Sequence, residues 1–201
     1  MGKRFFDVVF SSLAMVFFLP LGLALCLMIK LSSPGPVFYV SRRVGKKGCP
    51  IFCWKFRTMA IDAEQKLGEL LKENPVLRQE WETYFKLKDD PRVSAVGKFL
   101  RKTSLDELPQ FWNVLKGDLS VVGPRPVTEE EVQKYYGERA EKILSVRPGL
   151  TGIWQTSGRN LLTFEERTKL EESYVDHQSL ALDLQIICKT IPMLFFAKGA
   201  F

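Results

Sequence analysis

The sequence predicts an α+β fold that is mostly helical, with a small β-hairpin or sheet and one N-terminal membrane helix. Three observations lead to this fold class: a long uncharged run near the N-terminus, two short aromatic and β-branched runs around a glycine loop, and recurrent helical spacing of apolar residues. No repeat or linker separates a second domain after the uncharged run. We therefore expect residues 1–32 to form the membrane helix and residues 33–201 to form one domain.

The uncharged run over residues 8–29 has the length of a membrane helix, but Pro20 lies in its middle. A straight helix needs about 20 apolar residues to cross a bilayer core that is about 30 Å thick. Proline deletes a backbone hydrogen bond and costs about 3 kcal/mol inside a helix. Lys3 and Arg4 precede the run and Lys30 follows it, and such cations favour the cytoplasmic side. These signals predict either a spanning helix or a re-entrant helix broken at Pro20, and they leave both open.

The soluble part begins with a predicted β-hairpin and continues with helices. Residues 37–40 and 51–56 are the expected strands, and a basic glycine-containing loop over residues 42–48 lies between them. Helical spacing predicts helices over 62–73, 76–86, 93–100, 109–116, 128–144 and 164–176.

The C-terminal stretch over residues 180–196 is rich in Leu, Ile and Phe. Asp183 and Lys189 interrupt it, and Pro192 is expected to bend it. It is too polar for a second membrane span and predicts an amphipathic helix. That helix either lies at the membrane interface or packs into the core of the protein.

Composition restricts the chemistry. The net charge of +6 and the pI near 9.1 suit nucleic acid, anionic lipid head groups or phosphorylated substrates, and the total does not choose among them. His177 is the single histidine, which argues against histidine metal sites and a Ser-His-Asp triad. The four cysteines have no metal-binding spacing, and the phosphate-binding motif GxxxxGK[ST] does not occur.

An acidic turn is the strongest chemical signal in the chain. Ser104 followed by Glu107 fits a capping box, which would mark a helix start. Pro109 fits the first residue of the next helix better, so Asp106 and Glu107 are expected in an irregular turn. Adjacent carboxylates on such a turn point in different directions, so one can attack while the other holds a metal or a proton. Amide groups at the helix start also favour a phosphate.

Arginines in rigid turns follow the acidic pair. Pro124 and Pro126 flank Arg125, Arg147 precedes a Pro-Gly pair, and Arg159 follows a glycine. The rigid backbone presents each guanidinium with little entropy left to lose. Three such arginines predict an anionic ligand, most naturally a diphosphate.

Four long segments carry a resemblance to a known family. They are residues 55–59, 100–110, 113–126 and 147–152. With them the chain resembles the bacterial sugar transferases, the monotopic polyprenyl-phosphate phosphoglycosyl transferases, over essentially its whole length. The insert over residues 62–88 resembles the subgroup that transfers galactose 1-phosphate to undecaprenyl phosphate.

The resemblance implies an enzyme that moves a sugar 1-phosphate from a UDP-sugar to a polyprenyl phosphate, releases UMP and starts a surface polysaccharide. By similarity, Asp106 is the nucleophile that forms a phosphosugar-aspartate intermediate, and Glu107 helps to hold Mg²⁺. Arg125 in its Pro-Arg-Pro turn and Arg147 would hold phosphate or nucleotide. Weaker supporting candidates are Lys55, Arg57 and Arg101.

The resemblance also implies a location. The donor is cytosolic and the acceptor head group lies at the interface, so we expect a catalytic domain on the cytoplasmic face of the bacterial inner membrane, in contact with lipid and without nucleic acid. This expectation favours the re-entrant helix, although many members have serine before the proline where this chain has Leu19. Family chains often have further N-terminal spans and a regulatory domain, so the sequence is either a minimal enzyme or a catalytic region. A homodimer is suggested by resemblance only.

Other functions stay open from the sequence. A metal-dependent membrane-bound phosphodiesterase or hydrolase would use the same carboxylates with water as acceptor. A basic membrane adaptor would leave the acidic turn unexplained. Galactose is the favoured sugar, with glucose or an N-acetylated hexosamine as alternatives.

Overall fold

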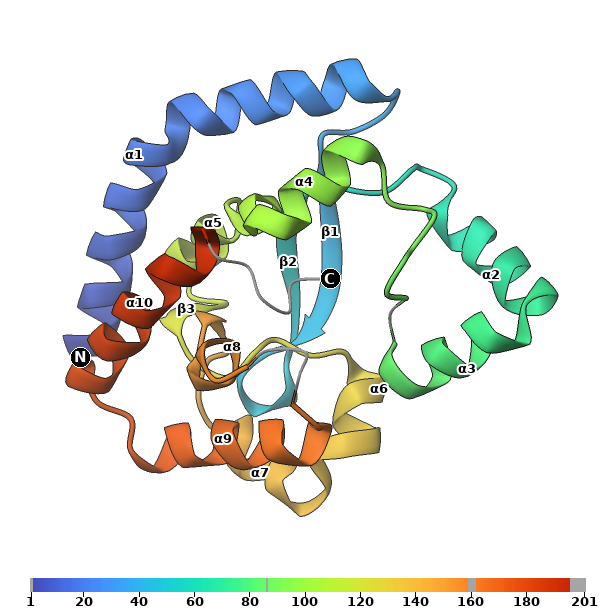
Figure 1. Ribbon diagram of the computed structural model, residues 1–201. Coiled ribbons are helices and arrows are strands. Elements are labelled where there is room, and N and C mark those ends of the chain that lie inside the picture. Colours follow the sequence, from blue (N-terminus) through green and yellow to red (C-terminus); the bar gives the residue numbers. More distant parts are fainter. Residues whose placement is uncertain (1, 86, 159–161, 196–201) are drawn as a thin grey trace.

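The computed structural model describes residues 2–85, 87–158 and 162–195, and it confirms the α+β class (Figure 1). Helices dominate, and the strands form two small two-stranded sheets. The insert forms α2 (Ala63–Glu73) and α3 (Pro75–Tyr84), which project from the side of the domain opposite α10 in Figure 1. Both helices were predicted from their spacing, and the Asn74 side chain caps α3 by accepting from two backbone N–H groups.

The predicted hairpin is present and is longer than expected. Strand β1 (Phe38–Val44) pairs antiparallel with β2 (Pro50–Phe56), with Phe38 opposite Phe56. The predicted basic loop therefore gives its first three residues to β1. A single 3₁₀ turn, η1 (Lys46–Gly48), reverses the chain, and Lys47 there has a φ of 58°.

The second sheet was not predicted. Strand β3 (Ser120–Val122) pairs in parallel with β4 (Gly149–Thr151). Strands of three residues carry no readable alternation, which explains the omission. The backbones approach so closely that a Cβ on Gly149 would lie 2.1 Å from the Gly123 nitrogen, so this crossing requires glycine.

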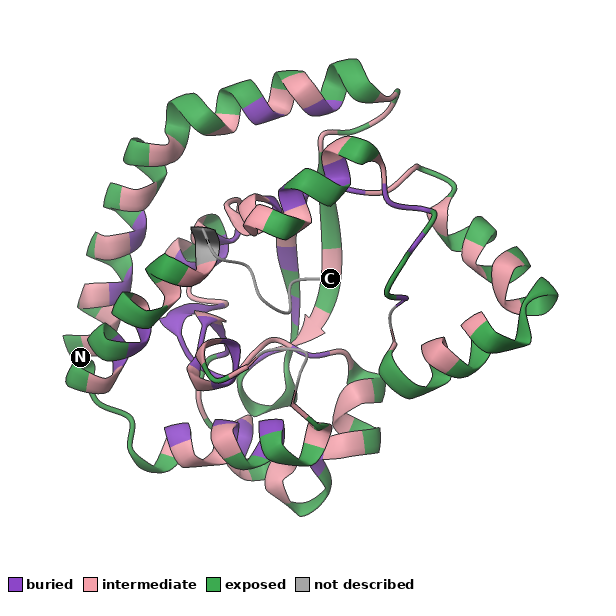
Figure 2. Cartoon of the chain, viewed as in Figure 1, coloured by how far each residue is buried: buried purple, intermediate pink, exposed green. Residues whose placement is uncertain are grey.

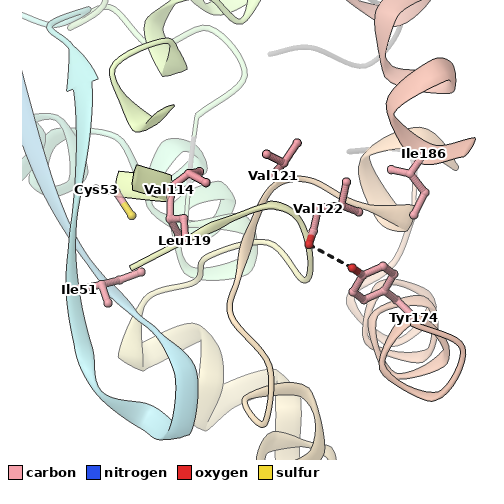
Figure 3. Close-up of a cluster of buried hydrophobic side chains, with 8 residues drawn as sticks. All are labelled: Ile51, Cys53, Val114, Leu119, Val121, Val122, Tyr174 and Ile186. Carbon is pink, nitrogen blue, oxygen red and sulfur yellow. Dashed lines mark hydrogen bonds between the residues drawn. The ribbon is translucent and has the colours of Figure 1, made fainter. Parts of the chain in front are cut away.

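The main core lies between the two sheets and the helices α5 (Gln110–Lys116), α9 (Phe164–Asp176) and α10 (Leu180–Phe195). Figure 3 shows its eight buried side chains, which are Ile51, Cys53, Val114, Leu119, Val121, Val122, Tyr174 and Ile186. The Tyr174 hydroxyl donates to an Asp183 oxygen over 2.7 Å and lies 3.0 Å from the Val122 carbonyl oxygen. These bonds join α9, α10 and β3.

Helix α1 (Gly2–Ser32) is a 31-residue helix with Pro20 inside it, and Figure 1 shows it bent about halfway along. It is long and apolar enough to cross a membrane, but only 11% of its most apolar window is buried in the protein. Figure 2 accordingly shows α1 as mostly exposed.

Polar side chains fix the first turns of α1 to the domain. Lys3 donates to the Val122 carbonyl over 3.0 Å and forms an ion pair with buried Asp183, while Arg4 donates to backbone carbonyls of α5. Asp7 is only 1% exposed and accepts from the Ser120 hydroxyl at 2.9 Å and from a β3 backbone N–H at 3.0 Å.

Apolar packing fixes the last turns of α1 to the same domain. Leu25 and Ile29 pack against Phe56 of β2 and against Leu100 of α4 (Ala95–Thr103), close to the predicted 93–100 helix. Both ends of α1 therefore lie against one domain, and its middle is free of that domain.

The prediction of one helix over residues 128–144 is wrong. The segment is divided into α6 (Glu129–Glu131), the π-helical η3 (Val132–Tyr136), the 3₁₀ turn η4 (Gly137–Arg139) and α7 (Ala140–Ile143). Gly137 has a φ of 49°, which a right-handed helix cannot contain.

Helix α10 packs into the core, one of the two predicted alternatives. Asp183 and Ile186 are buried on its inner face. Leu180, Leu184 and Ile191 are exposed on it, so an apolar row stays available at the surface.

Candidate active site

The backbone places the acidic pair in the irregular turn that Pro109 predicted. Helix α4 ends at Ser104, which has a φ of 57°, and a single 3₁₀ turn, η2 (Leu105–Glu107), follows. Pro109 then occupies the N-cap position of α5, without a side-chain capping bond. The Ser104 side chain makes no capping bond in η2, so the capping-box interpretation is wrong: Ser104 ends one helix rather than starting the next.

One lysine reaches both carboxylates. Lys55 on β2 lies 2.7 Å from Glu107 Oε1 and 3.9 Å from Asp106 Oδ2. Arg125 Nη2 lies 3.9 Å from the same Glu107 oxygen. Asp106 is 8% exposed, and no hydrogen bond to its carboxylate is present among the described residues.

The two carboxylates differ in protonation. Burial and, after it, the neighbouring Glu107 charge raise the pKa of Asp106 to about 6, while Lys55 opposes the rise. Burial alone would also raise the pKa of Glu107, but Lys55 and Arg125 hold it well below the ordinary value. Glu107 is therefore ionised throughout the neutral range, and Asp106 titrates just below neutrality.

A hollow opens beside the acidic pair. Three cations from three different parts of the chain line it, namely Arg43 of β1, Lys55 and Arg125. The remaining lining residues are Cys53, Glu107, Gln110, Pro126, Gly149 and Leu150. Cations around a single carboxylate favour an anion such as a phosphate in this hollow.

Arg101 lies behind the acidic pair. It belongs to the last turn of α4, and its Nε donates to the Thr58 hydroxyl over 3.0 Å. Burial lowers the pKa of this arginine, and the Asp106 charge opposes that shift. Its charge therefore acts on Asp106 from the protein side.

Two predicted arginines lie elsewhere. Arg57 is buried and its guanidinium donates to the carbonyls of Ser33 and Pro34, so it clamps the segment after α1. Arg147 donates to the Gly117 carbonyl over 2.8 Å and does not line the hollow. Sequence motifs could not show that Arg125 lines the hollow while Arg57 and Arg147 do not, because the partners of all three arginines are distant in sequence.

The remaining predicted residues are the two prolines that flank Arg125, and Arg159. Pro126 lines the hollow, and the Pro124 carbonyl accepts from the Gly149 N–H over 2.8 Å. Arg159 lies outside the described residues. Arg43 and Gln110 line the hollow without having been predicted, and the basic loop around Arg43 was the available signal for the first of them.

The fold and the hollow define an acidic, cation-lined site on a domain that carries a helix of membrane-spanning length. The chain belongs to the family described as bacterial sugar transferase, whose model matches residues 1–197.

Curated relatives share most or all of the sequence. The chain is 46% identical over 200 residues to the exopolysaccharide production protein ExoY of Sinorhizobium fredii, covering 100% of this chain and 88% of that protein. It is 43% identical over 199 residues to the undecaprenyl-phosphate galactose phosphotransferase of Salmonella typhimurium, covering 99% of this chain and 41% of that protein. The UDP-galactose-lipid carrier transferase of Erwinia amylovora is also 43% identical over 199 residues, with the same shares covered.

Proposed function

We propose that the protein transfers a sugar 1-phosphate, with galactose favoured, from a UDP-sugar to undecaprenyl phosphate, releasing UMP in the first membrane step of surface polysaccharide synthesis. The observation that carries the proposal is the buried Asp106 carboxylate, which has a raised pKa and no hydrogen bond among the described residues, beside a cation-lined hollow. Two similar proteins are named for undecaprenyl-phosphate galactose phosphotransfer and for UDP-galactose–lipid carrier transfer, which supports this donor and acceptor.

Asp106 is the nucleophile in this proposal. In the first step, its carboxylate oxygen forms a bond to the sugar-linked phosphorus of the UDP-sugar. The bond from that phosphorus to the bridging oxygen breaks, and UMP leaves with the electron pair. In the second step, a phosphate oxygen of the acceptor attacks the same phosphorus and the aspartate–phosphorus bond breaks, which regenerates the carboxylate.

The position of Asp106 supports this role. A carboxylate that already accepts strong hydrogen bonds has its lone pairs engaged, whereas the contact of Asp106 with Lys55 is 3.9 Å long. The covalent relay also lets two anionic substrates use the cation-lined hollow in turn. Ping-pong kinetics is therefore expected.

A Mg²⁺ ion fits the acidic pair as a cation shared with substrate. Proteins commonly hold Mg²⁺ with one or two carboxylates together with substrate phosphates and water. Among the described residues, no third carboxylate, histidine or cysteine joins the pair to form a protein-only site. Both cations near Glu107 contact Oε1, which leaves Oε2 for the ion. A bound Mg²⁺ would neutralise diphosphate charge and improve UMP as a leaving group.

Helix α1 enters the membrane and leaves by the same face in this proposal. Its first turns are fixed by Lys3, Arg4 and Asp7, and its last turns pack on the same domain through Leu25 and Ile29. A helix that crossed the bilayer would separate those two ends by its thickness. The bent middle would then lie in lipid, and the domain would lie on the cytoplasmic face of the inner membrane, where the donor is.

Cysteine labelling tests this topology. Gly2→Cys introduces an exposed thiol at the start of α1, and the exposed native Cys49 in the hairpin turn reports the face of the domain. Each variant keeps only one of these two thiols. We expect a membrane-impermeant maleimide to label each variant from the cytoplasmic side only. Labelling of the two positions from opposite sides would show a spanning helix.

The activity test uses the detergent-solubilised full chain with Mg²⁺, a panel of UDP-sugars and undecaprenyl phosphate, and it measures UMP. Asp106→Asn should abolish UMP release, and Asp62→Asn, an exposed aspartate paired only with Lys66, is the matched control. UMP release at full rate without the lipid acceptor would support the hydrolase alternative. Normal turnover of Asp106→Asn would contradict the nucleophile.

A further inference from the structure

Arg125 is the cation of the hollow whose side chain is held least by direct bonds. Its guanidinium approaches Glu107 only to 3.9 Å, which is longer than a hydrogen bond. Its side chain is 34% exposed, and no hydrogen bond from the guanidinium is present among the described residues. An ion pair this long fixes the guanidinium only loosely over the acidic turn.

The indole of Trp154 supplies one restraint on the guanidinium. Trp154 belongs to the short helix α8 (Ile153–Thr156), and the Arg125 guanidinium carbon lies over its ring, 5.5 Å from the centroid. The guanidinium carbon of Arg167 lies over the same ring at 4.5 Å. Guanidinium groups within about 6 Å of an indole centroid are attracted by the negative face of the ring.

The indole N–H does not bind Arg125 or Arg167. Trp154 is buried, and its Nε1 has no hydrogen-bond partner in the described part of the chain. The ring therefore acts on its neighbours through its faces. This predicts that another aromatic ring can replace it and that an aliphatic side chain of similar size cannot.

Glu171 supplies the second restraint, on the backbone. This α9 carboxylate is 1% exposed and accepts from the Arg125 N–H at 3.2 Å, from the Tyr136 hydroxyl at 2.7 Å and from Arg167 Nε at 3.2 Å. Arg167 offsets its charge, so the buried carboxylate is both paired and hydrogen-bonded. The backbone of the Pro-Arg-Pro turn is thereby fixed to α9.

We propose that Trp154 is a positioning residue that holds the Arg125 guanidinium over the hollow for a donor phosphate, while Glu171 fixes the backbone from which Arg125 extends. The inference rests on the proposed function, because it takes the diphosphate of a UDP-sugar as the ligand. The Arg125 N–H groups stay free for phosphate oxygens because the ring, rather than Glu107, restrains them.

A double-mutant cycle on the detergent-solubilised full chain tests the inference, with UDP as the probe and calorimetric affinity as the readout. Trp154→Leu should weaken UDP binding roughly 3- to 10-fold, as expected for loss of a partly desolvated cation–π contact. Trp154→Phe should keep affinity within about twofold, because the ring face is retained. In an Arg125→Ala background, Trp154→Leu should cause no further loss.

Trp81→Leu is the matched control. Trp81 on α3 also carries a guanidinium over its ring, that of Arg92 at 5.3 Å, but lies outside the hollow. Its replacement should leave UDP affinity unchanged. Equal losses from Trp154→Leu with and without Arg125, or a failure of Trp154→Phe to retain affinity, would overturn the positioning role.

The outcome separates this inference from the proposed function. A wild-type chain that neither binds UDP nor releases UMP would overturn the function. A wild-type chain that does both, with additive Trp154 and Arg125 effects, would overturn only the positioning role.

Discussion

The buried aspartates beside the start of α1 and in the acidic turn have opposite surroundings. Asp7 and Asp183 lie where α1 meets the domain and are 1% and 0% exposed. Asp7 accepts from a hydroxyl and a backbone N–H, and Asp183 from Lys3 and the Tyr174 hydroxyl. Asp106 in the acidic turn is 8% exposed, lies 3.9 Å from the Lys55 nitrogen, and accepts no hydrogen bond from the described residues. Satisfied hydrogen bonding, rather than burial, therefore distinguishes the two docking carboxylates from Asp106, the proposed nucleophile.

The largest expected effect is on activity at Asp106. Asp106→Asn should reduce UMP release by at least about 10³-fold, because an amide cannot act as the nucleophile. The same change should not lower stability, since the folded protein holds the pKa of Asp106 above its ordinary value and so disfavours the ionised form. Initial rates and thermal unfolding of the variant measure both effects.

The stability effect has a definite pH window. With a raised folded pKa, wild-type stability is lost as the pH rises from the ordinary value near 4 to about 6. The melting temperature of Asp106→Asn should therefore exceed that of the wild type above pH 6, and the difference should vanish below pH 4. If Asp106→Asn were less stable than the wild type at pH 7, the Asp106 carboxylate would stabilise the fold as Asp7 and Asp183 do.

The next largest effect is on stability at Asp183. Asp183→Asn removes the ion pair with Lys3, which is itself 28% exposed, and should lower the free energy of unfolding by about 2–3 kcal/mol. Denaturant unfolding in detergent measures it. Asp176→Asn, which removes an exposed ion pair with Lys142, is the control and should leave the free energy of unfolding nearly unchanged. An equal loss of unfolding free energy at the two positions would contradict the distinction between buried docking pairs and surface pairs.

A smaller effect concerns the pH–rate profile. In the proposed mechanism Asp106 must be ionised to attack, so kcat/KM should fall as the pH decreases through about 6, by up to about tenfold per pH unit. Lys55 holds the pKa of Asp106 down, so Lys55→Met should move the acidic limb to higher pH. A limb that stays in place in Lys55→Met would mean that another group controls it.

The sequence predicted the local features of this protein better than its long-range ones. The hairpin, the insert helices and the irregular turn at Asp106 follow from patterns within a few residues. The β3–β4 sheet joins strands that are separated by two turns and several short helices, and each strand is too short to show a period. Its pairing depends on a glycine crossing that a single sequence does not reveal.

The site divides in the same way. Asp106, Glu107 and Arg125 were predicted from turn chemistry, and Lys55 from a family motif, and the structure brings these four together. Arg57 had the same kind of signal but clamps the segment after α1. The contacts of Arg125 with Trp154 of α8 and Glu171 of α9 could not be predicted, because an isolated Trp or Glu on a helix does not indicate which distant residue it contacts.

The most direct test of the central claim is the intact mass of the protein after incubation with Mg²⁺ and UDP-galactose in the absence of lipid acceptor. We predict a gain equal to one hexose phosphate, located on Asp106 by peptide mapping, absent from Asp106→Asn and lost when undecaprenyl phosphate is added. UMP release without any protein adduct, or an adduct on another residue, would contradict the account.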